Sequence, residues 1–321
     1  MSKITLKLMQ HLQQTSHQPV LKDETTQRWF AGNELAADVD QLKDQLKGLH
    51  VGHGDVVLVA LPNSAVYPVL IQAIWELGAV VMPVADDVTP TGLNALLHQR
   101  AFAACVVTPE LLNAATDALS TVTRLQLNTT DELTLVRNLA IKGNVAATPT
   151  EADLALLVTV SNASKRLGLT YAQLRDDAGS AVAEYHLTAA DRTLLVTSLA
   201  QRDAQVALLA ARLTGSRVIL SPSLDASQFW PQVLDNAVTH LALPSGEVTS
   251  LLKTLSLMSP AGHLEFMPHA TTSQRYHVRQ PAMAASVFIN GPKKSIIKDR
   301  HQSVGYVHGS LKLAGAFHDT G

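Results

Sequence analysis

Apolar residues in the first part of the chain follow two different spacings. From Leu35 to Leu46 they recur three or four positions apart, which predicts a helix with one apolar face. From Val56 to Leu61 every residue is apolar, which is typical of a strand that is buried on both faces. The two patterns then alternate, and they predict helices over 64–77 and from 89 onward and strands over 79–84 and 104–108.

A polar stretch rich in Thr and Asn, over residues 128–151, interrupts this alternation, which then resumes. The pattern predicts strands over 154–159, 193–197, 217–220 and 238–243 and helices over 170–186, 204–214 and 226–236. Strands that alternate with helices favour an α/β fold of two lobes, each with a largely parallel sheet flanked by helices. We expect the lobes to span 1–150 and 151–256, and we expect irregular short strands and loops over 257–321, which has no clear period.

Composition narrows the class of partner. Hydrophobic residues make up 46% and charged residues 16% of the 321 positions, as expected for a folded globular protein. A formal net charge of −2 without a basic cluster argues against nucleic acid as a partner. No apolar run is long enough to cross a bilayer and no signal sequence is evident, so we expect a cytoplasmic protein without a membrane span.

Common catalytic and metal-binding patterns are not found in the sequence. The single cysteine, Cys105, lies in an apolar run and is expected to be a small buried core residue. The 13 histidines include no pair at metal-ligand spacing on a predicted helix, so we predict no metal site. The Gly-x-Ser-x-Gly elbow of hydrolases and the Gly-x-Gly-x-x-Gly fingerprint of dinucleotide-binding proteins are also missing.

Two segments nevertheless resemble conserved blocks of a known enzyme family. From Leu49 to Ser64 the chain has a Gly-His-Gly-Asp turn, an apolar strand and then Pro-Asn-Ser. From Ala73 to Val84 a helix end with Gly-Ala leads into an apolar strand and Pro. These blocks are similar to those of adenylate-forming (acyl-activating, AMP-binding) enzymes, and weaker agreement extends over residues 25–255. The resemblance implies the fold of the large N-terminal domain of these enzymes, with their C-terminal lid domain missing.

The resemblance also implies a chemistry and a phosphate-binding loop. Enzymes of this family use ATP and Mg²⁺ to convert a carboxylate into an acyl-adenylate, and their Ser-, Thr- and Gly-rich loop ends in Pro-Lys-Gly. In this chain the corresponding segment has no glycine before Lys165, Ser164 in place of the proline and Arg166 in place of the following glycine. We expect it to join a buried strand to a helix N-terminus near Thr170, where amides favour anions. The candidate phosphate-binding residues of this degenerate loop are Thr159, Ser161, Ser164, Lys165 and Arg166.

The altered loop leaves several functions open. One is an acyl-CoA synthetase-like ligase for a small or fatty carboxylate, with impaired or lost catalysis. The alternative is a non-catalytic pseudo-enzyme that binds an acyl group, a nucleotide or a protein partner, or that forms a homo-oligomer. A third is a decaying paralogue without a selected function, and for this last case the loop is an ordinary solvated connection. We assign no catalytic residue, because the family's aromatic-Gly-x-Thr-Glu block and lid lysine have no counterpart in the sequence.

Overall fold

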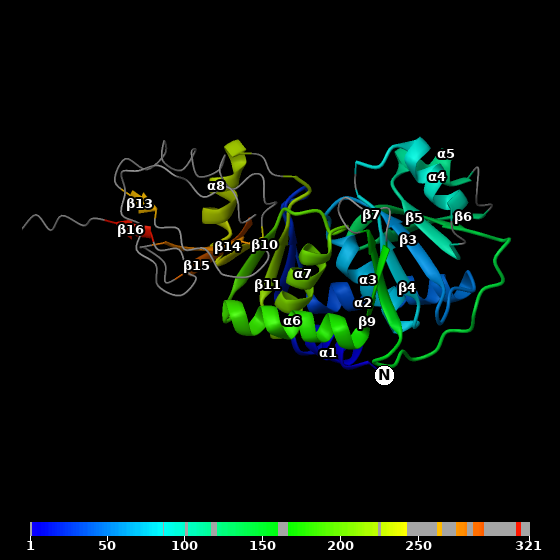
Figure 1. Ribbon diagram of the computed structural model, residues 1–321, viewed down its shortest axis with the longest axis horizontal. Coiled ribbons are helices and arrows are strands. Elements are labelled where there is room, and N and C mark those ends of the chain that lie inside the picture. The colour runs from blue at the N-terminus through cyan, green and yellow to red at the C-terminus, as the bar shows by residue number, and fades with distance from the viewer. Residues whose placement is uncertain are drawn as a thin grey trace, which may run out of the picture.

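The computed structural model in Figure 1 describes residues 2–85, 87–99, 102–116, 121–159, 166–223 and 226–242, and the strands at 262–264, 274–280, 285–291 and 313–315. Its helices are α1 (Lys3–Gln14), α2 (Gly32–Gly48), α3 (Val66–Glu76), α4 (Pro90–Gln99), α5 (Leu112–Thr116), α6 (Tyr171–Tyr185), α7 (Arg202–Thr214) and α8 (Ala226–Asp235), with a short 3₁₀ helix at Pro109–Leu111. None of the described helices is both long and apolar enough to cross a membrane.

The strands form two larger sheets and two small pairs. They are β1 (Pro19–Asp23), β2 (Arg28–Ala31), β3 (Val56–Ala60), β4 (Val80–Pro83), β5 (Ala104–Val107), β6 (Thr121–Leu127), β7 (Thr130–Arg137), β8 (Leu154–Thr159), β9 (Arg166–Thr170), β10 (Arg192–Leu195), β11 (Arg217–Leu220), β12 (His240–Ala242), β13 (Gly262–Leu264), β14 (Gln274–Gln280), β15 (Ala285–Gly291) and β16 (Leu313–Gly315).

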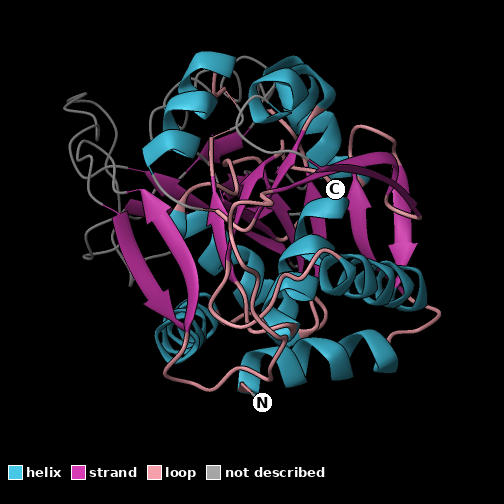
Figure 2. Cartoon of the chain, turned by 90° about the vertical axis from the view of Figure 1, so that its right-hand side faces the viewer, coloured by secondary structure: helices cyan, strands magenta, loops and turns pink. Residues whose placement is uncertain are grey.

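The first large sheet has seven strands in the order β6-β7-β5-β3-β4-β8-β9. The central strands β5, β3, β4 and β8 are parallel, and antiparallel strands complete both edges. Val57 and Val59 face the apolar layer that contains α2 and α3, whereas Leu58 faces the layer of α4 and α5. Figure 2 shows helices on both sides of the strands. This two-sided burial explains the uninterrupted apolar run, and Cys105 is buried in β5 as expected.

The second large sheet has five strands in the order β12-β10-β11-β1-β2, of which only β2 is antiparallel to its neighbour. A single apolar core contains residues of α1, α2, α3, α6 and α7 and of both sheets. Within it, the Tyr171 hydroxyl donates to the Trp75 carbonyl at 3.1 Å, and the Trp75 indole donates to the Ala155 carbonyl at 2.8 Å. These bonds tie α6, α3 and β8 together.

The predicted α/β class, with parallel strands flanked by helices, is confirmed. The division expected near residue 150, however, does not coincide with the division between the sheets. β1 and β2 precede that position and belong to the second sheet, whereas β8 and β9 follow it and belong to the first. Local periodicity does not reveal this exchange, because it reports which face of an element is buried and not which distant strand it pairs with.

Three strands of the first sheet, β6, β7 and β9, were not predicted. β7 lies within the polar stretch, and only its last five residues are buried, so its sequence lacks a strict alternation. β9 contains Gly168 and lies between the candidate loop and α6. In the segment 257–321, the strands β13 to β16 are described, and the remaining residues of that prediction lie outside the described part of the chain.

Candidate functional site

The candidate phosphate loop connects the two strands of a β-hairpin at the edge of the first sheet. β8 and β9 are antiparallel, and Thr159 at the end of β8 pairs with Arg166 at the start of β9. The structure therefore brings these two candidate residues together at the base of the loop. The other three candidates, Ser161, Ser164 and Lys165, lie outside the described residues.

The loop begins at an edge of the sheet that is well placed for binding a ligand. β8 is parallel to β4, with Val81 opposite Leu156, and β4 is parallel to β3. The carboxyl ends of these three strands therefore lie at one edge, together with the start of the loop. In open α/β sheets, ligands bind outside the carboxyl ends of the strands. The end of β8, from which the candidate loop begins, thus lies at this edge of the sheet.

The expectation that this loop leads directly into a helix N-terminus is wrong. β9 intervenes, and Thr170 lies beside Leu154, at the end of the hairpin away from the loop. At about 3.4 Å per residue the helix begins roughly 15 Å from the loop, and the helix dipole acts only within about one turn. The first amides of α6 are also capped locally, since the Thr170 hydroxyl accepts from Gln173 N at 3.2 Å and the Gln173 side chain accepts from Thr170 N at 2.9 Å. The start of α6 is therefore not part of an anion site at this loop.

Asn63, from the Pro-Asn-Ser block, joins the carboxyl ends of strands from both large sheets. Its side-chain amide donates to the carbonyls of Thr197 and Ser221, at 2.9 and 3.2 Å. Its side-chain oxygen accepts from Leu199 N at 2.9 Å. Asn63 follows β3, and its partners follow β10 and β11, so one buried amide aligns three strand ends.

Asp23, at the end of β1, adds a fourth strand end to this junction. One carboxylate oxygen accepts from Ala65 N at 2.8 Å, and the other accepts from Thr25 N at 2.8 Å. The sequence analysis did not assign a role to Asp23. Asn63 lies within the recognised block, but its role was visible only once its partners were placed.

The Gly-His-Gly-Asp turn holds the connection that leads from β7 to β8. The Asp55 carboxylate accepts from the backbone N–H groups of Gly52 and Asn144 and from the Asn144 side-chain amide, each at 2.9 Å. A side chain at Gly52 has no room, because a Cβ there would lie 2.3 Å from the Asn144 carbonyl oxygen. Gly78 has a φ of +74°, and a Cβ there would lie 2.5 Å from the Ala147 carbonyl oxygen. The residues that carry the family resemblance therefore fix the place where the connection from β7 to β8 packs against the turn at 52–55.

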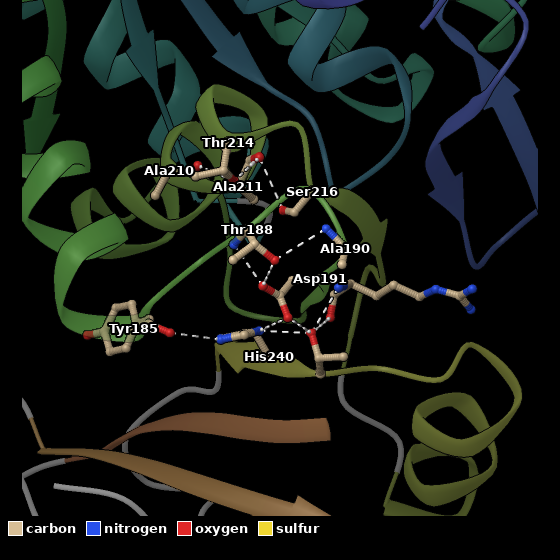
Figure 3. A network of polar contacts seen from close by, with 11 residues as sticks. Tyr185, Thr188, Ala190, Asp191, Ala210, Ala211, Thr214, Ser216 and His240 are labelled. Atoms are coloured by element: carbon tan, nitrogen blue, oxygen red, sulfur yellow. Dashed lines mark hydrogen bonds and ion pairs between the residues drawn. The ribbon is translucent and has the colours of Figure 1, made fainter. Parts of the chain in front are cut away.

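The Asp-Arg pair at the start of β10 belongs to a polar network around the buried His240 ring (Figure 3). Asp191 accepts from the N–H and the hydroxyl of Thr188, at 2.7 and 2.8 Å, and from the Thr239 hydroxyl at 2.9 Å. His240 Nε2 donates to the Tyr185 carbonyl at 3.2 Å, and its Nδ1 lies 2.8 Å from the Thr239 hydroxyl. Burial lowers the pKa of His240 to about 4, although Asp191 acts in the opposite direction. The network connects α6, β10 and β12 and is structural.

Comparison with known proteins identifies the family to which this scaffold belongs. The profile of the AMP-binding enzyme family matches residues 8–284. The chain belongs to this family. A curated relative, the probable CoA ligase CCL9 from Humulus lupulus, is 26% identical over 223 residues, which cover 64% of this chain and 42% of the relative. The chain thus spans less than half the length of that relative.

Solved structures of enzymes described as acyl-CoA ligases or synthetases share the fold of this chain. The N-terminal domain of FACL13 from Mycobacterium tuberculosis matches with a TM-score of 0.65 and 16% identity, covering 81% of this chain and 67% of that one. The long-chain-fatty-acid-CoA ligase FadD1 from Archaeoglobus fulgidus matches with a TM-score of 0.66 and 15% identity, covering 80% and 54%. At such identities these structures establish the fold alone. Together with the family profile, they confirm the resemblance seen in the sequence.

Enzymes of the AMP-binding family use ATP and, typically, Mg²⁺. No group of three His, Cys, Asp or Glu side chains converges within that part of the chain, so we assign no Mg²⁺ ligand. For the ATP phosphates, the Arg166 guanidinium has the right charge and begins β9 directly after the loop. The described residues thus offer a cationic group at the loop but no assigned metal ligand.

Proposed function

We propose that this chain is an adenylate-forming, acyl-CoA ligase-like protein for a small or fatty carboxylate, and that its catalysis is impaired or lost. The observation that carries the proposal is the sequence of the loop between β8 and β9. It contains no glycine, and Arg166 occupies the position at which the family has a glycine. Family membership supports the carboxylate class of substrate, and the loop supports the loss of activity.

The physical reason lies in how a triphosphate is held. Glycine lets the backbone adopt positive φ and come close to the ligand, and residues with a Cβ restrict both. Activation of a carboxylate places developing charge on the α-phosphate, which preorganised N–H donors must stabilise. The loss of one such donor typically lowers the rate by about 10²- to 10³-fold. The replacement of several loop residues is therefore sufficient to remove measurable turnover.

The test is carboxylate-dependent exchange of pyrophosphate into ATP, measured with short-, medium- and long-chain carboxylates. We expect no exchange above the protein-free background, while an active acyl-CoA synthetase measured in parallel gives the positive control. The double variant Ser164→Pro/Arg166→Gly restores the Pro-Lys-Gly ending and shows whether the loop alone limits the reaction. Robust exchange by the unmodified chain with any carboxylate contradicts the proposal.

A second candidate, a non-catalytic protein that binds nucleotide, rests on the charge that remains at the loop. Lys165 and Arg166 add two positive charges at the edge where ligands of α/β sheets bind. We expect ATP to bind with a Kd of about 0.1 to 1 mM, or roughly 4–6 kcal/mol. In calorimetric titrations, Lys165→Ala weakens binding and lowers its salt dependence, whereas the surface control Lys47→Ala leaves it unchanged. Identical isotherms for all three proteins exclude this function for the loop.

A further inference from the structure

A groove runs along α1, on the side of the second sheet away from the candidate loop. Its first part has a volume of about 320 Å³ and lies between α1, α6 and the end of α7. An adjoining part of about 390 Å³ continues past the end of α7 to the residues that precede β10 and β11. Lys7, Leu213 and Thr214 line both parts, so the two form one continuous surface. Figure 1 shows α1 and α6 side by side at the lower edge of the molecule.

This groove is separate from the candidate functional site. Thr188 and Gly215, which line its second part, precede β10 and β11 and therefore lie at the amino ends of these strands. Asn63 and the start of the candidate loop lie at the carboxyl ends. The two surfaces are thus on opposite edges of the fold. A ligand in the groove does not overlap a nucleotide at the hairpin.

The first part of the groove has an apolar lining in which one wall is left open. Val182 and Leu213, both partly exposed, supply apolar side chains, and the buried Ile4 lies beneath them. Gly179, in the middle of α6, lines the same part, and a Cβ at that position would meet no atom within 4 Å. Glycine inside a helix costs about 0.5–1 kcal/mol relative to alanine, and no packing constraint requires it here. Its effect is to leave room between α1 and α6.

The rim of the groove carries the basic side chains of Lys3, Lys7 and Arg175, with the Glu151 carboxylate beside them, since it accepts from Lys3 N at 2.6 Å. Lys3 and Lys7 lie on successive turns of α1, and neither forms an ion pair among the described residues. Arg175, also at the rim, is paired with Glu151 and Asp176. The half-buried His11 ring lines the second part, beside Gly215. The pKa of His11 is lowered by burial and, to a smaller extent, by the nearby charges of Arg212 and Lys7.

We propose that this groove binds a single-chain amphiphile with a carboxylate head, that is, a medium-chain fatty carboxylate, at a site separate from the candidate active site. The alkyl chain lies against Val182 and Leu213, in the space beside Gly179. The carboxylate lies at Lys7, where the apolar part meets the polar part.

The alkyl chain and the carboxylate charge of the ligand contribute to binding in different ways. Burial of the alkyl chain provides the affinity, at about 25 cal/mol for each Å² of apolar surface removed from water. The exposed lysines provide selection for the anion and a dependence on salt. The proposal does not depend on catalysis at the hairpin, because it uses only residues of α1, α6 and α7. It therefore stands or fails independently of the proposed function.

The test is calorimetric titration of octanoate, with octanol and acetate as comparison ligands, into the full chain and three variants. Gly179→Leu fills the groove and is expected to weaken octanoate binding at least about tenfold, a change that corresponds to 1.4 kcal/mol. Lys7→Gln is expected to weaken it up to about fivefold, the range for one exposed ion pair, and to reduce its salt dependence. Gly179→Ala adds one methyl group and serves as the matched control, with nearly unchanged binding.

The position of the bound ligand is tested separately through the magnetic resonance signal of the His11 ring. This signal is assigned because it is missing from the spectrum of His11→Gln. We expect octanoate to shift this resonance in the unmodified chain and in Gly179→Ala, but not in Gly179→Leu. Melting temperatures at or above that of the unmodified chain show that the Gly179 variants are folded. Equal affinity for octanol and octanoate contradicts the proposal that the groove recognises a carboxylate head group. Binding that is unchanged by both Gly179→Leu and Lys7→Gln overturns the groove.

Discussion

Asp55 shows how a family motif acts at the scale of one residue. The carboxylate is buried and accepts three hydrogen bonds, all of them from N–H groups of Gly52 and Asn144. The side-chain amide of an asparagine at this position would place its own N–H group against these N–H donors. We therefore expect Asp55→Asn to lower the free energy of unfolding by about 1–3 kcal/mol, the cost of leaving buried polar groups unsatisfied. Urea unfolding measures this, and Asp44→Asn is the control.

Asp44 is a suitable control because its side chain is 77% exposed and lies 3.7 Å from Lys47. Substitutions at such surface positions change stability by no more than about 0.5 kcal/mol. An equal loss of stability in Asp55→Asn and Asp44→Asn contradicts the role assigned to Asp55. The comparison removes the same formal charge in both variants, so it isolates the hydrogen bonds.

Gly52 and Gly48 are close in sequence but differ in the space around them. A Cβ at Gly52 would lie 2.3 Å from a backbone oxygen, whereas a Cβ at Gly48 would meet nothing within 4 Å. Gly52→Ala therefore displaces the connection to β8 and is expected to cost about 1–3 kcal/mol, as other overpacked sites do. Gly48→Ala is expected to be neutral or stabilising. Thermal unfolding of the two variants measures both effects. If Gly48→Ala is the less stable variant, the close contact at Gly52 is not what limits stability.

At the scale of the element, the hairpin of β8 and β9 separates the candidate loop from the start of α6. The Thr170 hydroxyl caps α6, so Thr170→Ala is expected to destabilise the protein by about 1 kcal/mol. Because the cap lies at the far end of β9, the same variant is expected to leave the affinity for ATP unchanged. Calorimetric titration alongside Lys165→Ala measures this. Parallel weakening of ATP binding by both variants shows that the helix does contribute to the loop.

At the scale of the whole molecule, buried histidines couple stability to pH. The pKa of His240 is about 4 in the folded protein and about 6.5 in the unfolded chain, and that of His11 is also lowered. The unfolded state therefore binds protons first as the pH falls. Stability from these groups is complete above about pH 6.5 and is lost toward pH 4. Between pH 7.5 and 5 we expect a loss of about 2 kcal/mol from His240 alone.

Urea unfolding at pH 7.5, 6 and 5 measures the pH dependence as the slope of stability against pH. His240→Gln is expected to flatten this slope, and His17→Gln, at an exposed position, is expected to retain it. Comparing slopes avoids any difference in absolute stability between the variants. A slope that is identical in all three proteins shows that His240 does not carry the dependence.

The sequence alone determined the class of the fold, most helices and central strands, and the family. Buried strands are apolar on both faces and helices have one apolar face, so periodicity reveals both. The turn around Asp55 carries part of the family resemblance, but its structural role appears only where Asn144 donates to Asp55. Tertiary structure alone decided that β1 joins β11, that β9 separates the loop from α6, and that Gly179 opens a groove against α1. The first and the third are contacts between segments distant in sequence, and local hydrophobic patterns do not encode which distant segment is met. The second depends on the pairing of β9 with β8 in a hairpin, which the sequence of β9 does not reveal.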